Sequence, residues 1–185
     1  MFSTPERLAA RTPKDGVGRF EFLELLVKEF KTTKSTEAKE QVLANLANFA
    51  YDPVNYQFLR KLSVIDIFLD QLGESNKPYD NIALVFFFPD RENKSYILHC
   101  GGVNKIALFL NNSDEDTVLS AITTLMFLVN PQSKKPDTLK SILEHSRNEN
   151  KRISNLANIF LQDYCYLVTE PCSWDKIYGF PTPVI

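Results

Sequence analysis

Hydrophobic residues recur every three or four positions along most of the chain, and this spacing predicts amphipathic helices rather than strands. The first stripe consists of Phe20, Leu23, Val27 and Phe30, with charged residues outside it. The same spacing predicts further helices over Glu37 to Ala50, Tyr56 to Leu62, Val64 to Leu72, Thr138 to His145, and a final helix carrying Ile153, Leu156, Ala157, Phe160, Tyr164 and Leu167.

Polar residues indicate where several of these helices begin. Asp52 followed by Pro53 predicts a helix start, because aspartate accepts hydrogen bonds from free N–H groups and proline suits the first helical position. Ser113 is expected to cap a long helix whose first turn is acidic. The stretch from Pro131 to Pro136 is expected to be a loop.

The pattern repeats along the chain at an interval of roughly 40 residues. Asp52, with Asn55 three residues later, is echoed by Asp90 with Asn93, and each pair precedes a short hydrophobic helix, a break at a small residue, and a second helix. The breaks are Ser63 in one unit and Gly101 with Gly102 in the other. The run VLANLANF from Val42 to Phe49 resembles AITTLMFL from Ala121 to Leu128 at about twice this interval.

Units of this length that contain two or three helices are typical of armadillo and HEAT repeats, which stack to bury their hydrophobic faces. We therefore predict an all-α fold, an armadillo-like α-solenoid of about three repeats. The segment between Gly73 and Asp90 is short for a third helix, so the middle repeat is expected to be abbreviated.

Three segments follow from this interpretation. Residues 1–17 contain prolines and glycines with little periodicity, and are expected to form a disordered N-terminal arm. Residues 18–169 are predicted to form the helical-repeat domain. Residues 170–185 form a C-terminal tail in which Trp174, Tyr178 and Phe180 either dock on the array or bind something else.

Composition limits the classes of function. The formal net charge of −2 argues against a protein that binds nucleic acid mainly by neutralising phosphates. Charged residues near the N-terminus interrupt any secretory signal, and no stretch approaches the roughly 18 apolar residues of a membrane span, so we expect an intracellular protein. Three unevenly spaced cysteines favour reduced thiols over a disulfide framework.

No group of residues in the sequence has the pattern of a catalytic or metal site. The glycines at Gly101 and Gly102 lack the rest of a phosphate-binding loop, and His99 and Cys100, as neighbours on a helix, would not face each other. Cys165 and Cys172 have no second close pair of ligands for zinc. We predict no catalytic residue, no metal, no cofactor and no small-molecule substrate, and we interpret Phe86 to Phe88 as core rather than as an exposed anchor.

Asparagines beside the hydrophobic stripes are the more informative polar residues. Asparagine is a mediocre residue inside helices, so its presence suggests amides that hold the backbone of an extended peptide. The alternative is that these amides only cap neighbouring helices inside the stack. The residues concerned are Asn45, Asn48 and Asn55 near the second helix, and Asn155 and Asn158 in the last one.

Several runs resemble the armadillo repeat-containing protein 7 family. They are EAKEQVLANLANFAYDP from Glu37 to Pro53, DRENKSYILHCGGV from Asp90 to Val103, EDTVLSAITTLM from Glu115 to Met126, NLANIFLQDYC from Asn155 to Cys165, and GFPTP from Gly179 to Pro183. The short segment before Asp90 and the stretch from Pro131 to Asn150 depart from that pattern.

The resemblance implies a nuclear, non-enzymatic scaffold that binds an RNA-recognition-motif protein in the minor spliceosome. That partner would contact most of the RNA. We place the partner-binding residues in or beside a groove formed by the third helices of the repeats, at Asn45, Asn48, Tyr51, Asp52, Asn155 and Asn158.

Two other functions fit the residues. In the first, the protein binds RNA directly through Arg60, Lys61, Arg91, Lys94 and Lys105, with Tyr56 and Tyr96 as stacking platforms. In the second, it is a cytoplasmic adaptor for cytoskeletal or transport cargo. Steep weakening of RNA binding with salt would favour the first, and exclusion from nuclei would favour the second.

Overall fold

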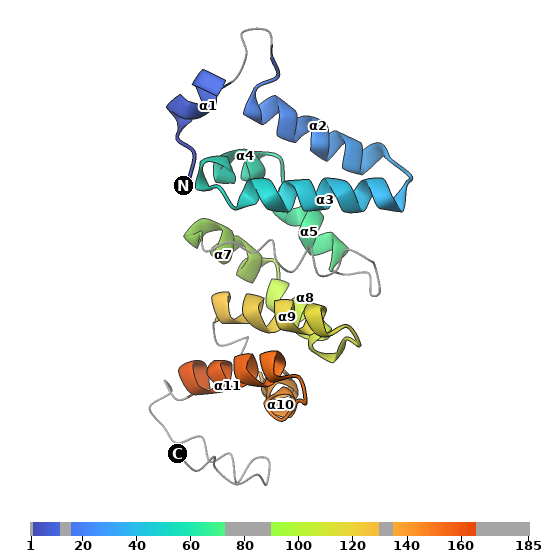
Figure 1. The fold of residues 1–185 in the computed structure, drawn as a ribbon, viewed down its shortest axis with the longest axis vertical. Helices are drawn as coiled ribbons and strands as arrows, with labels where there is room; N and C mark the ends of the chain where they lie inside the picture. Colours follow the sequence, from blue (N-terminus) through green and yellow to red (C-terminus); the bar gives the residue numbers. More distant parts are fainter. Residues whose placement is uncertain (1, 12–15, 73–89, 130–134, 166–185) are drawn as a thin grey trace.

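The protein is a stack of short helices, shown in Figure 1 as a computed structural model. The structure describes residues 2–11, 16–72, 90–129 and 135–165. All regular secondary structure within these residues is helical. In chain order the elements are α1 (Pro5–Arg11), α2 (Arg19–Thr32), α3 (Thr36–Ala50), η1 (Pro53–Asn55), α4 (Tyr56–Lys61), α5 (Val64–Gln71), α7 (Arg91–His99), α8 (Gly102–Ala107), η2 (Leu108–Asn111), α9 (Glu115–Phe127), α10 (Pro136–His145) and α11 (Lys151–Cys165).

The helices form units of the predicted kind, which confirms the armadillo-like fold class. The helices α7, α8 and α9 make one complete three-helix unit, with α4 and α5 before it and α10 and α11 after it. Figure 1 shows the longer helices α3, α9 and α11 crossing the stack at successive levels. These are the third helices that the sequence predicted.

The breaks inside two units have the same backbone conformation. Ser63, between α4 and α5, has φ of 54°, and Gly101, between α7 and α8, has φ of 71°. They are the residues with positive φ in the described part of the chain. The left-handed conformation reverses the chain between two short helices, and glycine adopts it without the close contact that a Cβ causes.

Contacts between units follow the repeat interval. Lys105 donates from Nζ to the backbone oxygen of Leu69 across 2.8 Å, and Arg152 Nη1 lies 3.3 Å from Asp116 Oδ1; each pair is 36 residues apart. His145 Nε2 contacts the backbone oxygen of Leu110 at 2.5 Å, which places a hydrogen-bond donor at the end of η2. Consecutive units are thus joined through helix ends as well as through the core.

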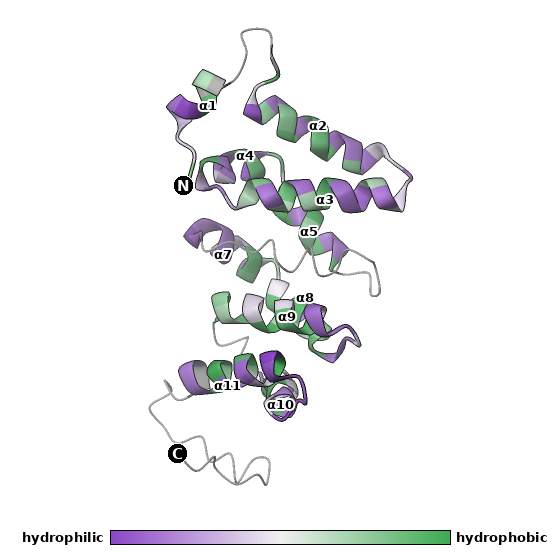
Figure 2. Cartoon of the chain, viewed as in Figure 1, coloured by the Kyte–Doolittle hydropathy of each residue, from purple (hydrophilic) through white to green (hydrophobic). Residues whose placement is uncertain are grey.

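The core is one continuous hydrophobic cluster that runs through the stack. Figure 2 shows hydrophobic and hydrophilic residues alternating around the individual helices, as amphipathic helices require. The largest side chains with less than 2% exposure come from most of the described helices: Phe68, Phe160, Leu23, Leu43, Leu46, Leu72, Ile97, Ile106, Leu110, Ile122 and Leu125.

Two predicted helix starts were wrong by one or two residues. Asp114, not Ser113, caps α9, because its backbone is extended and its carboxylate reaches the Thr117 N–H at 2.9 Å. Ser113 lies one residue too early to do this. The helix expected from Thr138 begins at Pro136, where proline occupies the first turn and needs no hydrogen-bond acceptor for its nitrogen.

The N-terminal segment differs from the expected disordered arm. Thr4 Oγ1 accepts a hydrogen bond from Arg7 N–H at 3.3 Å, and Pro5 and Glu6 follow in the first turn, which together begin α1. The backbone N–H of Ser3 also donates to Asp52 Oδ2 at 3.0 Å. The predicted short middle repeat, Phe86 to Phe88, most of the loop from Pro131, and the tail beyond residue 165 lie outside the described residues.

Candidate protein-binding face

One row of accessible side chains runs along each of the helices α3, α9 and α11. The positions are three, four or seven residues apart, so each row lies on one side of its helix, away from the buried stripe. We call these rows together the third-helix face, and define it as Gln41, Asn48 and Tyr51 from α3 and its C-cap, Ser120, Thr123 and Phe127 from α9, and Arg152, Asn155 and Ile159 from α11.

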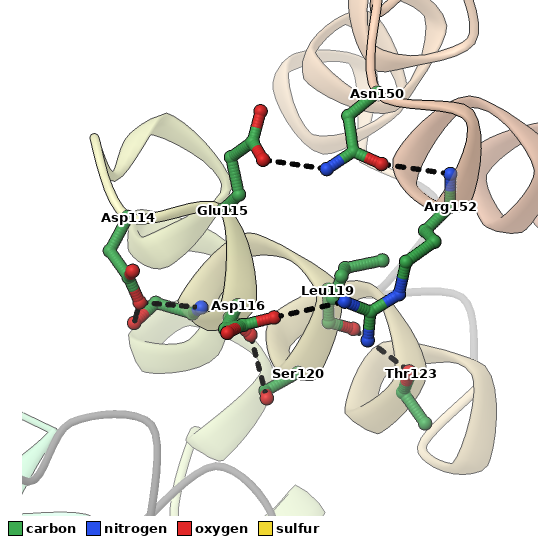
Figure 3. Close-up of polar contacts among 9 residues, drawn as sticks. Asp114, Glu115, Asp116, Leu119, Ser120, Thr123, Asn150 and Arg152 are labelled. Atoms are coloured by element: carbon green, nitrogen blue, oxygen red, sulfur yellow. Dashed lines mark hydrogen bonds and ion pairs between the residues drawn. The ribbon is translucent and has the colours of Figure 1, made fainter.

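Polar contacts fix α9 against α11 at one end of this face (Figure 3). Arg152 pairs with Asp116 at 3.3 Å, and Asn150 donates from Nδ2 to Glu115 Oε2 at 2.6 Å. Asn150 Oδ1 also accepts the Arg152 N–H at 2.9 Å. The side chains of Arg152 and Asp116 are 74% and 66% exposed, so the pair orients two helices more than it stabilises the fold.

The predicted amides differ in how available they are. Asn48 and Asn155 are exposed, on α3 and α11 respectively. Asn45 is half-buried and accepts from Gln41 Nε2 at 3.4 Å, while Asn158 Nδ2 lies 3.5 Å from the backbone oxygen of Ser146, at the end of α10. Asn48 and Asn155 are thus accessible to a peptide, and their role in binding one stays a prediction, whereas Asn45 and Asn158 have contacts within the chain.

Asn55 is a clear case of the capping interpretation. It is fully buried, and its Nδ2 donates to the backbone oxygen of Phe49 at 2.7 Å, near the end of α3. The hydrogen bond satisfies one of the carbonyl groups that a helix leaves without a partner at its C-terminus. The Nδ2 group of Asn55 is therefore committed to the end of α3 and is not available to a peptide.

Tyr51 and Asp52 follow α3 directly and have different environments. Tyr51 is 55% exposed at the C-cap of α3. Asp52 is half-buried, caps η1 by accepting from Val54 N–H at 3.4 Å, and accepts from Ser3 N–H. Burial raises the pKa of Asp52, but hydrogen bonds from Ser3 and Val54 and the nearby charge of Arg19 outweigh it and lower this pKa below its usual value.

Two hydrophobic residues on the third-helix face were missed in the sequence. Phe127 is 51% exposed at the end of α9, and Ile159 is 43% exposed one turn after Asn155 on α11. The signal for Phe127 was present, because aligning AITTLMFL with VLANLANF puts Phe127 at the position of Asn48. Exposed hydrophobic side chains beside exposed amides are typical of surfaces that bind protein segments.

Two of the five basic residues that could bind RNA, Arg60 and Lys105, are engaged with other parts of the array. Arg60 Nη1 lies 2.9 Å from Asp90 Oδ1, and its Nη2 lies 3.1 Å from Glu92. Lys105 donates to Leu69, as described above. Tyr96 donates its hydroxyl proton to Asp66 across 2.6 Å, and this hydrogen bond raises the pKa of the phenol. These contacts reduce the free positive charge of the proposed strip.

Within residues 2–11, 16–72, 90–129 and 135–165, no three His, Cys, Asp or Glu side chains are arranged to hold a metal ion. None of the described helices is long and apolar enough to cross a membrane.

Stacked units that repeat at about 36 residues, with third helices presenting amides and isolated hydrophobic residues on one face, define an armadillo-type helical-repeat protein. Comparison with known proteins gives the particular family. The chain is 49% identical over 158 residues to armadillo repeat-containing protein 7 of Mus musculus, an alignment that covers 80% of each chain. The chain therefore belongs to the armadillo repeat-containing protein 7 family, as the resemblance indicated. No model of a protein family matches it.

Proposed function

We propose that the protein is a nuclear scaffold of the minor spliceosome, which acts in pre-mRNA splicing by holding an RNA-recognition-motif protein on its third-helix face. Membership of the armadillo repeat-containing protein 7 family is the observation that carries the proposal. The coarser role, protein binding by helical repeats, is what this family and fold suggest. The spliceosomal partner and the nuclear location rest on the resemblance described in the sequence.

The composition of the third-helix face supports an extended protein segment as the bound species. Exposed amides at Asn48 and Asn155 can donate to and accept from a peptide backbone, and Tyr51, Phe127 and Ile159 supply hydrophobic contact between them. Asn45, Asp52 and Asn158 are placed at the rim, since each already has a contact within the chain.

The formal net charge and the engaged arginine and lysine favour this proposal over direct RNA binding. A surface that binds RNA mainly through phosphates requires cations that are free to contact them. If the isolated protein bound RNA with submicromolar affinity at low salt, and lost it at physiological salt, the RNA-binding alternative would replace the scaffold role.

Affinity purification of the tagged full chain from its own cell extract, with and without nuclease, tests the proposal. We expect an RNA-recognition-motif protein with spliceosomal companions to remain bound after nuclease treatment. Recovery of cytoskeletal or transport factors, together with exclusion of the tagged chain from nuclei, would instead support the cytoplasmic adaptor.

A further inference from the structure

Equivalent polar pairs begin the first helices of two consecutive units. In the later unit, Asp90 caps α7 and Asn93 lies in its first turn, with Asp90 Oδ1 accepting the Asn93 N–H at 2.9 Å. In the earlier unit, Asp52 caps η1 and Asn55 ends it, with Asp52 Oδ1 accepting the Val54 N–H at 3.4 Å. Each pair thus offers a carboxylate and an amide oxygen at the same place in its unit.

The later pair holds an arginine. Arg60, from α4 in the preceding unit, directs Nη1 to Asp90 Oδ1 and to Asn93 Oδ1, both at 2.9 Å. Asn93 is only 6% exposed, so the guanidinium satisfies a buried amide oxygen as well as a charge. A planar group with several N–H donors is suited to two acceptors in this arrangement.

The earlier pair lacks this arginine. Asn55 is 0% exposed, and its Nδ2 donates to the backbone oxygen of Phe49. Among the buried side-chain oxygen and nitrogen atoms in the described part of the chain, only Asn55 Oδ1 has no hydrogen-bond partner. The described helices before this unit are α1, α2 and α3, and none of them supplies a donor to Asn55 Oδ1 as Arg60 does to Asn93 Oδ1. Asp52 Oδ2 accepts the Ser3 N–H instead.

Arg19, whose charge acts on Asp52, is engaged elsewhere. The guanidinium carbon of Arg19 lies 4.7 Å from the centre of the Phe49 ring, an arrangement that gives a cation–π interaction. In Figure 1 the first residues of the chain lie beside the corner between α3 and α4, where Asp52 is located. The N-terminal segment, rather than Arg19, therefore takes the hydrogen bond that the earlier pair offers.

We propose that Asp52 and Asn55 form a binding site for an arginine side chain of a partner protein, and that the Ser3 N–H holds the Asp52 carboxylate of this site in the free chain. A partner arginine would replace the Ser3 N–H at Asp52 and give Asn55 Oδ1 the donor that Asn93 receives from Arg60. This inference rests on the proposed scaffold role for its biological meaning, and it names one side chain that the partner contributes.

A titration of the full chain with N-acetyl-arginine amide, followed by the NMR signals of Val54 N–H and the Asn55 side-chain amide, tests the site. Ser3→Pro removes the N–H that binds Asp52, whereas the control Ser3→Ala keeps it. We expect arginine-dependent shifts in Ser3→Pro at a concentration at least about tenfold lower than in the wild type or Ser3→Ala, since one competing hydrogen bond to a charged group is lost. N-acetyl-lysine amide is expected to produce much smaller shifts.

Asp52→Asn in the Ser3→Pro background keeps a helix cap but removes the charge, and should weaken arginine binding by about tenfold or more. Equal shifts with arginine and lysine, or none with either, would overturn the site. A change in the chemical shift of Arg19 Nε in Ser3→Pro, before any ligand is added, would also overturn the site, because Arg19 would then fill it. The titration uses no partner, so its failure is separate from failure of the affinity purification.

Discussion

Ser63 and Gly101 have the same left-handed backbone conformation at equivalent breaks of consecutive units, with φ of 54° and 71°. Glycine adopts this conformation without an energetic penalty, whereas a residue with a Cβ adopts it at a cost in free energy. The unit that contains Ser63 therefore carries backbone strain that the unit containing Gly101 avoids.

Replacement of Ser63 by glycine should stabilise the protein. We expect the free energy of unfolding in urea to rise by about 0.5–1 kcal/mol, because relief of the left-handed strain exceeds the extra entropy of glycine in the unfolded chain. Ser63→Ala keeps a Cβ, and should stay within about 0.5 kcal/mol of the wild type. A less stable Ser63→Gly protein would show that the Ser63 side chain contributes something the backbone does not explain.

Gly101 and Gly102 should both resist replacement by alanine, for different reasons. A Cβ on Gly101 would meet no atom within 4 Å, so Gly101→Ala should cost about 1–2 kcal/mol through backbone strain alone. A Cβ on Gly102 would lie 2.5 Å from Ile97 Cγ2, so Gly102→Ala should cost about 1–3 kcal/mol through overpacking.

Ile97→Leu distinguishes the two causes, because leucine has no methyl group at the Cγ2 position. When Ile97→Leu is added to each glycine variant, urea unfolding should show that it restores part of the unfolding free energy lost in Gly102→Ala and none of that lost in Gly101→Ala. Equal recovery in both backgrounds would contradict the assignment of strain to one glycine and close contact to the other.

Arg60 should contribute more to stability than Arg152, although each joins two units through an aspartate. Arg60→Ala leaves Asn93 Oδ1 buried without a donor, and should lower the free energy of unfolding by about 2 kcal/mol. Arg152→Ala removes a pair whose side chains are 74% and 66% exposed, and should cost less than about 1 kcal/mol. Urea unfolding of both variants measures the difference. Similar losses of unfolding free energy would show that burial of the acceptor does not determine how much each arginine contributes to stability.

Acid should weaken the cap of α9. The hydroxyl and N–H of Thr117 donate to Asp114 and lower its pKa below the ordinary value of 3.8. Since the folded pKa is the lower one, this stabilisation is complete above about pH 4 and is lost as the pH falls through the folded pKa. Asp114→Asn retains a good cap without the titration, so its unfolding free energy should change less between pH 5 and pH 2. If Asp114→Asn and the wild type lost the same unfolding free energy between pH 5 and pH 2, the ionised carboxylate would not have this role.

The repeat architecture was predictable from the sequence because the same physical requirements recur in each unit. Asp52 and Asp90 both cap helices, and Ser63 and Gly101 both allow a left-handed break, so local chemistry reveals the interval. The contact of Ser3 with Asp52 was not predictable, since it joins residues 49 positions apart through a backbone donor that every residue except proline possesses.

The candidate face was only partly predictable. A helical pattern shows that Asn48, Asn155 and Asn158 lie outside the hydrophobic stripe, but not that Asn158 approaches the end of α10. The exposure of Phe127 was not predicted from the sequence, because it depends on which neighbouring helix covers the residue. Tertiary packing, rather than periodicity, separates the surface amides from the capping ones.

The third-helix face is the surface on which we propose that a partner protein binds, and comparative affinity purification tests this proposal. Full-length Asn48→Ala, Phe127→Ser, Ile159→Ser protein would be compared with wild type and with a Lys140→Ala, Glu144→Ala control, whose changes are exposed on α10 and leave the net charge unaltered. All three proteins should first show the same helical content by circular dichroism. We expect partner proteins that resist nuclease treatment to remain on the wild type and the control, and to be lost from the face variant. Equal retention by all three would contradict it.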